Sequence, residues 1–218
     1  MERLTTSFQG GNFIKFSTKI PKFNEQSHSV LMKEGWKPLK EPKSLTNAAL
    51  LSVPFMVINA LLSIGIIYCY SSFSMQRFSF IKGNSIILTI DLGVVLVILL
   101  MVIIHELFHL IFIPNFLKSK DTIIGLTCFG AFVHTEQIIT KARFMFISAA
   151  PFLFLSILFP LILAIFGFLT GKILVFILFN ALGASVDILG FFLVFVQVPK
   201  NAIIKSNGTR TYWKMGAE

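Results

Sequence analysis

The chain has 218 residues, of which 55% are hydrophobic and 13% are charged. A soluble domain of this size cannot cover so much apolar surface, so the composition indicates an integral membrane protein. The net charge of +9 is typical of nucleic-acid-binding proteins, but loops that flank membrane spans also carry Lys and Arg. The two cysteines, Cys69 and Cys128, are far apart, which argues against a disulfide framework and a thiolate zinc site.

Residues 1–46 are polar and basic, with eight Lys or Arg against four Glu. We expect this region to lie in the cytoplasm in front of a first membrane span, because basic segments collect on that side. Apolar and polar residues partly alternate over 13–20, which is compatible with a short strand. No cleavable signal peptide is predicted, since the first apolar run begins only near Asn47.

Four apolar runs follow, and each is long enough to cross the hydrocarbon core as a helix of about 20 residues. The predicted spans are residues 48–70, 85–113, 144–168 and 173–196. Between the second and third spans, two short strand-like segments flank Gly130. They predict a β-hairpin insert over residues 121–140.

The predicted fold is therefore a mainly α membrane protein with four transmembrane helices, a small cytoplasmic β-hairpin and both termini in the cytoplasm. Basic residues support this orientation, because they gather in the N-terminal region, the insert and the tail. We expect a transmembrane domain over residues 47–198 and a cytoplasmic tail over residues 199–218. This topology accounts for the net charge, so no nucleic-acid partner is expected.

The second apolar run contains a His-Glu-x-x-His motif formed by His105, Glu106 and His109. Ionisable side chains are rare inside membrane spans and mark functional sites. Positions i and i+4 share one face of a helix, so the two histidines can bind the same zinc ion. Glu106 lies one residue further round the helix, where it can act as a general base without ligating the metal.

A catalytic zinc ion needs a third protein ligand. Asp187 is the best candidate, because it lies about as far from the cytoplasmic end of its span as His105 does, roughly 12–14 Å deep. His134 in the insert is the alternative ligand. Asp91 lies near the outer end of the second span, too far from the motif to ligate the same ion.

Asn180 precedes Asp187 by two helical turns and shares its face. Its amide is a candidate to bind a substrate backbone or to orient Asp187, and a helix-packing contact explains it equally well. The buried cluster as a whole also has two other interpretations. It can be a set of helix-packing hydrogen bonds, or a proton or ion pathway that includes Asp91.

These residues resemble the site-2 protease type of intramembrane metalloprotease, which has His-Glu-x-x-His in one span and a zinc-binding Asp in a later one. Ala149-Ala150-Pro151 resembles the small-residue segment with proline that lies between the two in that family. The stretch from Asn180 to Asp187 stands where the family has an Asn-containing turn. More narrowly, the chain is similar to small bacterial membrane proteins described as "putative zincin peptidases", whose closing segment Asn207 to Lys214 also fits.

The resemblance implies one zinc ion on His105, His109 and Asp187, with Glu106 as the catalytic base. The leading hypothesis is an intramembrane zinc endopeptidase, a multi-pass protein of a bacterial cell membrane, which cleaves membrane-embedded proteins or peptides. An extended substrate segment can add to the edge of the predicted hairpin. The alternative, from another functional class, is a zinc-binding, non-proteolytic scaffold or regulator of membrane partners.

Overall fold

The computed structural model describes residues 14–70, 81–82, 85–86, 92–127 and 130–216. Its helices are α1 Glu25–Lys33, α2 Leu45–Tyr70, α3 Leu92–Ile111, α4 Lys141–Pro151, α5 Phe159–Ile165, α6 Gly171–Gly183 and α7 Ser185–Gln197. A short 3-10 helix at Phe116–Lys118 and a π-helix at Phe152–Leu158 complete the helical segments among these residues. The strands are β1 Lys15–Ser17, β2 Lys37–Pro38, β3 Ile81–Lys82, β4 Ser85–Ile86, β5 Thr122–Thr127, β6 Gly130–Thr135, β7 Ile139–Thr140, β8 Ala202–Asn207 and β9 Arg210–Met215.

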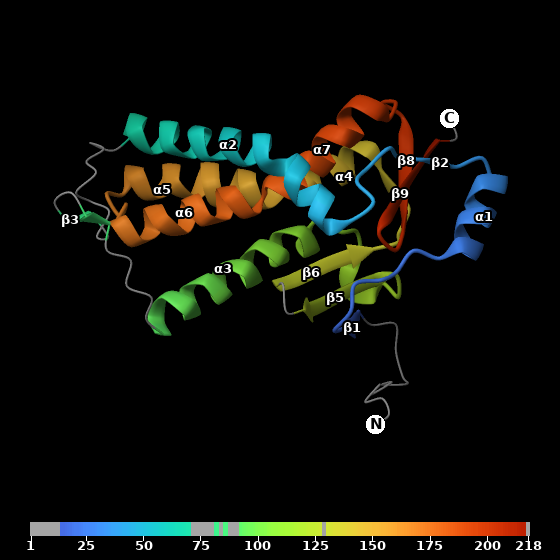
Figure 1. Ribbon diagram of the computed structural model, residues 1–218, viewed down its shortest axis with the longest axis horizontal. Helices are drawn as coiled ribbons and strands as arrows, with labels where there is room; N and C mark the ends of the chain where they lie inside the picture. The colour runs from blue at the N-terminus through green and yellow to red at the C-terminus, as the bar shows by residue number, and fades with distance from the viewer. Residues whose placement is uncertain (1–13, 71–80, 83–84, 87–91, 128–129, 217–218) are drawn as a thin grey trace, which may run out of the picture.

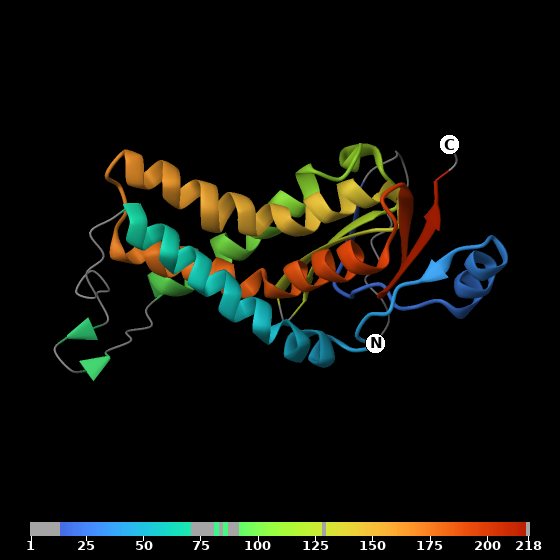
Figure 2. The same ribbon diagram turned by 90° about the horizontal axis from the view of Figure 1, so that it is seen from above.

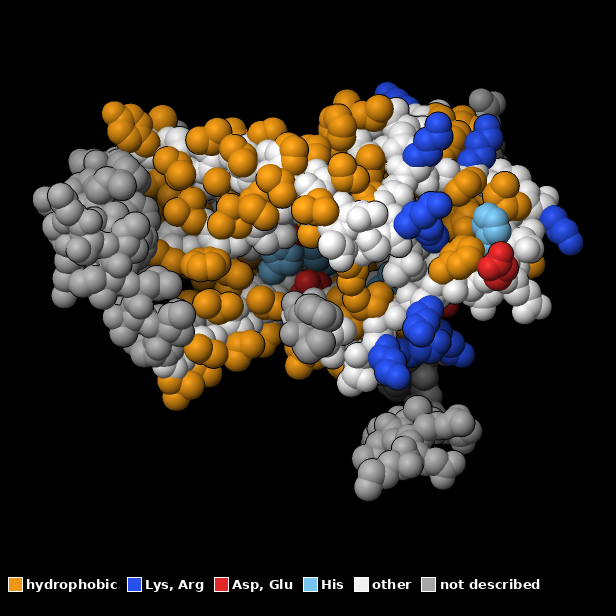
Figure 3. All heavy atoms as spheres, in the orientation of Figure 1, with side chains coloured by type: hydrophobic (Ala, Val, Ile, Leu, Met, Phe, Trp, Pro, Cys, Tyr) orange, Lys and Arg blue, Asp and Glu red, His pale blue; other side chains and the backbone are white. Residues whose placement is uncertain are grey.

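The long apolar helices and the two larger sheets occupy opposite ends of the molecule. Helices α2, α3, α5 and α6 fill one end, while α1 and the strands β1, β2, β5, β6, β8 and β9 lie towards the other (Figures 1 and 2). Hydrophobic side chains cover the helical end, and Lys and Arg gather over the sheet end (Figure 3). The charge distribution therefore follows the division between helices and sheets.

The prediction of four transmembrane helices with a single hairpin is wrong. Two helical segments, Leu45–Cys69 and Lys141–Ile165, are long and apolar enough to cross a membrane. A bent pair, Ile173–Gly183 and Ser185–Gln197, raises the number to three at most among the described residues. Within α3, in the predicted second span, the apolar segment Val95–Ile111 is shorter than the roughly 20 residues that a bilayer crossing needs.

The predicted fourth span fails as a single straight helix because the chain bends at Ala184. The two parts of the bent pair meet at an angle of 41°. Ala184, with a ψ of 0°, ends α6, and its backbone N–H donates to the carbonyl of Asn180. The bend lies three residues before Asp187, so it sets the direction in which the first turn of α7 presents its side chains.

The sheets are larger than the predicted hairpin. Strands β1, β5 and β6 form one sheet in that order, with β1 parallel to β5 and β6 antiparallel to it. Strands β2, β9, β8 and β7 form a second sheet, in which all neighbours are antiparallel. Strands β3 and β4 form a separate antiparallel pair. The segments predicted as polar tails therefore contribute strands to folded sheets.

The second sheet forms because the C-terminal segment is itself a hairpin. Strands β8 and β9 pair over their whole length, and Gly208 in the turn between them has a φ of +53°. An Asn-Gly pair between strands is a strong hairpin signal, because glycine adopts a positive φ without strain. The N-terminal segment then adds β2 alongside β9, and the backbone N–H of Leu39 donates to the carbonyl of Thr211.

A hydrophobic cluster joins the second sheet to α7. Val194 at the end of α7 and Val198 after it pack with Ala202 and Ile204 of β8 and with Leu39. All five side chains are buried. This shared core fixes the sheet relative to the helix that carries Asp187.

Candidate metal centre

Helix α3 presents His105 and His109 on one face, and α7 presents Asp187 opposite them. The Nε2 atom of His105 lies 3.1 Å from Oδ2 of Asp187, and the Nε2 atom of His109 lies 3.4 Å from Oδ1 of the same carboxylate. The two imidazole rings stand edge to face with centroids 5.1 Å apart. The i, i+4 spacing predicted from the sequence therefore brings both rings to one point, and the bend before α7 brings the carboxylate there.

The Nδ1–H of each histidine, on the side of the ring away from Asp187, donates to a carbonyl oxygen. The Nδ1–H of His109 donates to the backbone carbonyl of Ile147 in α4 over 2.9 Å. The Nδ1–H of His105 donates to Oδ1 of Asn180 in α6 over 2.9 Å. Because a carbonyl oxygen can only accept, both Nδ1 atoms carry the hydrogen, and both Nε2 lone pairs face Asp187.

Asn180 is completely buried and ties three helical segments together. Its Nδ2 donates to the carbonyl of Pro151 over 3.1 Å and to Oγ of Ser156 over 2.9 Å. These two acceptors fix the amide so that its oxygen faces His105. Ser156 lies in the π-helix that follows Pro151, and such irregular turns are frequent at functional sites. The amide is engaged by protein groups, which favours a positioning role over contact with substrate.

Glu106 points towards the first sheet and is not one of the converging groups. The backbone amide of Val133 in β6 lies beside its carboxylate. Helix α3 packs against β6, so the motif glutamate lies between the histidines and that strand. This position matches a side chain that contacts a reacting group beside the metal ligands without binding the metal itself.

Strand β6 is the outer strand of its sheet and turns its free edge towards this site. The backbone N–H of Glu136 donates to the carbonyl of Asp121 across the hairpin over 2.9 Å. In an antiparallel pair such bonds alternate, so the backbone groups of Ala131, Val133 and Thr135 point away from β5. The amide of Val133 beside Glu106 agrees with this register.

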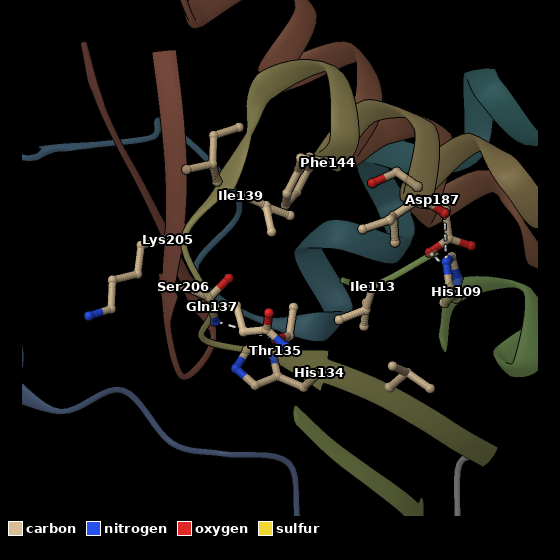
Figure 4. A pocket seen from close by; sticks show the side chains of 14 residues that line it. His109, Ile113, His134, Thr135, Gln137, Ile139, Phe144, Asp187, Lys205 and Ser206 are labelled. Carbon is tan, nitrogen blue, oxygen red and sulfur yellow. Dashed lines mark hydrogen bonds and ion pairs between the residues drawn. The ribbon is translucent and has the colours of Figure 1, made fainter. Parts of the chain in front are cut away.

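A cavity of about 170 Å³ adjoins His109 and Asp187. It lies between the end of α3, the start of α4, β6 and the β7–β8 pair, and Figure 4 shows His109 and Asp187 at one end and His134 towards the other. Its lining residues are His109, Ile113, Val133, His134, Thr135, Gln137, Ile139, Phe144, Ile147, Ser148, Asp187, Ile204, Lys205 and Ser206. The candidate centre is therefore open to a pocket large enough for part of a ligand.

The three converging side chains suit a metal ion. One potential ligand atom from each of His105, His109 and Asp187 lies within 4.8 Å of the others. Two imidazole nitrogens and one carboxylate oxygen are a donor set that zinc accepts, and three protein ligands leave a fourth position for water or substrate. The hydrogen bonds at both Nδ1 atoms are the outer contacts that orient histidine ligands in zinc sites.

The other residues considered from the sequence lie outside this group. His134 is in β6, where its Nε2 is 3.8 Å from Oε1 of Glu136, and burial lowers the pKa of its imidazole. It lines the cavity but does not join the three converging side chains. Asp91 lies outside the described residues. Sequence reasoning missed the backbone groups of Ile147 and Val133, because a carbonyl or an amide carries no side-chain signal.

Comparison with known proteins agrees with this geometry. A family model described as "Putative zincin peptidase" matches residues 98–203, a stretch that contains His105, Glu106, His109 and Asp187. No curated protein and no solved structure matches the chain. Zincins are zinc-dependent peptidases, so the match indicates a metallopeptidase and implies zinc as its metal. The central part of this chain, from residue 98 to residue 203, is thus similar to the zincin peptidase family.

Proposed function

We propose that this protein is a zinc-dependent endopeptidase of the site-2 protease type, which cleaves membrane-embedded proteins or peptides. The observation that carries the proposal is the convergence of His105, His109 and Asp187 within 4.8 Å, with Glu106 on the same helix as the two histidines. In this proposal the first three residues hold one zinc ion and Glu106 is the general base.

The surface of the helical end supports a location in the lipid bilayer. Leu50, Leu51 and Leu61 of α2 are each more than half exposed. Large apolar side chains gathered on a surface mark contact with lipid or with another protein. Histidine and acidic side chains are visible in a hollow between the apolar surface of α3 and that of α2 and α6 (Figure 3). A substrate in the bilayer can therefore approach the site from the side.

Zinc bound by this donor set would lower the pKa of a water molecule and polarise the scissile carbonyl. Glu106 takes a proton from the attacking water and returns it to the nitrogen of the leaving amine. The oxygen of that water adds to the carbonyl carbon, the C–N bond breaks, and a carboxylic acid and an amine are released. Ile147 and Asn180 keep both histidine rings in one tautomer throughout.

The free edge of β6 gives the substrate a place to bind in an extended form. The outward-facing carbonyl of Val133 and the backbone groups of Thr135 can pair with a peptide strand, as in other complexes formed by strand addition, while the N–H of Val133 bonds Glu106. Because Val133 lies beside Glu106, a strand in this register passes next to the general base. Strand addition also unwinds a substrate helix locally, which exposes its peptide bonds.

The test is the variant Glu106→Gln, made in purified full-length protein. We expect cleavage of quenched fluorescent peptides that contain a transmembrane segment to fall by about 10²–10⁴-fold, the range typical of a lost general base. Zinc content, measured by elemental analysis, should stay at one ion per chain. Glu136→Gln is the matched control, because Glu136 lies in the same region but outside the converging group, and it should retain activity.

Two results separate this proposal from its alternative. Full proteolytic activity in Glu106→Gln would contradict the role given to Glu106. A wild-type protein that holds stoichiometric zinc but cleaves none of the peptides would instead favour a zinc-binding, non-proteolytic scaffold.

A further inference from the structure

The cavity beside the candidate metal centre has walls that select a particular kind of side chain. Six of the fourteen lining side chains are aliphatic or aromatic, namely those of Ile113, Val133, Ile139, Phe144, Ile147 and Ile204. The polar lining residues other than His109, Asp187 and Lys205 are His134, Thr135, Gln137, Ser148 and Ser206, which are uncharged or, in the case of His134, have a pKa lowered by burial. Lys205 also lines it, but Figure 4 shows its side chain extending away from the space that the apolar residues enclose. Among the described residues that line it, Asp187 alone carries a carboxylate, and that carboxylate already faces the two histidines. A charged ligand group placed among the apolar residues would therefore lack a partner there.

The volume of the cavity sets the size of its occupant. The cavity measures about 170 Å³. An engineered apolar cavity of about 150 Å³, lined by Leu, Ile and Phe residues, binds benzene, which gives the scale of the space. A phenyl ring or the branched end of a leucine therefore fits here. Alanine leaves most of the space empty, and the larger indole ring of tryptophan does not fit without movement of the walls.

The location of the cavity identifies the molecule that supplies this side chain. It begins at His109 and Asp187 and runs along Val133 and Thr135, the part of β6 whose backbone groups face outward. A peptide paired with that edge places alternate side chains on opposite faces. One of them enters the cavity while the neighbouring peptide bond lies beside Glu106.

We propose, on the basis of the function proposed above, that this cavity is the specificity pocket of the enzyme and accepts a phenylalanine or leucine side chain next to the scissile bond. Val133 and Ile139 are the specificity-determining residues, because they line the pocket from β6 and β7 and are not among the three metal-binding residues of the candidate metal centre. The substrate class is thus a peptide that carries, next to the scissile bond, a large apolar residue without a branch at Cβ, such as leucine or phenylalanine.

The test measures binding, so that it does not depend on cleavage. Blocked pentapeptides that differ only at the central residue (Gly, Ala, Leu, Phe or Trp) are titrated into Glu106→Gln protein, with zinc and after its removal. We expect Leu and Phe peptides to bind about 10- to 100-fold more tightly than the Ala peptide, the range given by burial of one large apolar side chain. The order should persist without zinc, because the pocket walls are protein side chains.

Two substitutions change the pocket in opposite directions. Val133→Phe should fill it and reduce the preference for Phe over Ala to less than about 2-fold, whereas Ile139→Ala should enlarge it and make Trp the preferred residue. Leu126→Phe is the matched control, because Leu126 lies on the adjacent strand, is 64% exposed and does not line the cavity. It should leave the order unchanged. If Val133→Phe fails to fold, the enlarged variant still decides the question.

The outcomes keep this inference separate from the proposed function. Equal binding of all five peptides, or the same order in Val133→Phe as in the control, would overturn the specificity pocket even if the wild type is an active peptidase. If the protein binds the Leu and Phe peptides most tightly but wild-type protein cleaves none of the peptides, the specificity pocket stands and the proposed peptidase function is contradicted.

Discussion

The helical part of the molecule (α2 to α7) and the sheet part (α1 and the strands β1, β2 and β5 to β9) both bury polar side chains, but they connect them differently. In the helical part, Asn180 bonds both Ser156 and His105. Ser185, two residues before Asp187, bonds Ser52 of α2. In the sheet part, the buried polar side chains of the described residues bond one another or the backbone, and none of their hydrogen bonds reaches His105, His109 or Asp187. Asn207, for example, bonds the backbone of Asn24 in both directions. Convergence of polar groups, and not their burial, therefore distinguishes the candidate site.

The largest expected effect follows from removing the carboxylate on which that convergence depends. Asp187→Ala deletes the group that faces both Nε2 atoms, so zinc affinity should fall by more than the about 10–100-fold that loss of an outer-shell partner causes. Competition with a chelator measures the affinity, and elemental analysis measures the zinc content. His134→Ala serves as the control and should keep full zinc. Normal zinc in Asp187→Ala with loss in His134→Ala would move the third ligand to β6.

The second largest expected effect is on zinc affinity, and it distinguishes a hydrogen bond that orients a metal ligand from one that only packs helices together. Asn180→Ala removes the acceptor for His105 and should lower zinc affinity by about 10–100-fold. Asn59→Ala removes a similarly buried amide, whose Nδ2 donates to the carbonyl of Ala181 over 3.1 Å, and should leave zinc affinity unchanged. Both variants should unfold more easily, by about 1–3 kcal/mol for each group left unpaired.

Chelator competition on the two asparagine variants, with thermal unfolding as the parallel measurement, decides the matter. Equal zinc affinities in Asn180→Ala and Asn59→Ala would mean that Asn180 acts only in helix packing. The candidate site would then consist of His105, His109 and Asp187 alone, without support from Asn180.

The same contrast explains what could be predicted from the sequence. His105, Glu106 and His109 stand out because ionisable residues are rare in an apolar run, and their spacing translates directly into one helix face. Asp187 could be matched to them by its depth alone. The number of spans could not be predicted, because hydropathy does not show that the chain bends at Ala184.

The sheets were harder still to predict, because their pairing is long-range. Lys37 pairs with Trp213, and Lys15 pairs with Ile123, and nothing near either residue in the sequence specifies its partner. The turn at Asn207-Gly208 did carry a usable signal, since Asn-Gly between alternating segments is typical of a hairpin. The carbonyl of Ile147 behind His109 could not be predicted at all, because every residue has a carbonyl.

The smallest effect concerns Glu41, an ionisable group of the sheet part that belongs to no converging cluster. Burial raises the pKa of its carboxyl, although the N–H of Thr211 and the charge of Arg210 act in the opposite direction. The folded protein therefore holds this proton more tightly than the unfolded chain does. The resulting contribution to stability is complete below the ordinary value of 4.5 and is lost as the pH rises through the higher value of the folded state.

Glu41→Gln keeps an oxygen that can accept from the Thr211 N–H but removes the titration. Between about pH 4 and about pH 7, the unfolding midpoint of the wild type should fall relative to that of the variant, by about 2–4 °C or less. Zinc content should be the same in both proteins at neutral pH, because Glu41 is not among the converging side chains. Parallel midpoints across this range would show that the buried carboxyl titrates alike in the folded and unfolded chains. A loss of zinc in Glu41→Gln would instead couple the sheet part to the metal centre, most directly through the core that Leu39 shares with Val194 of α7.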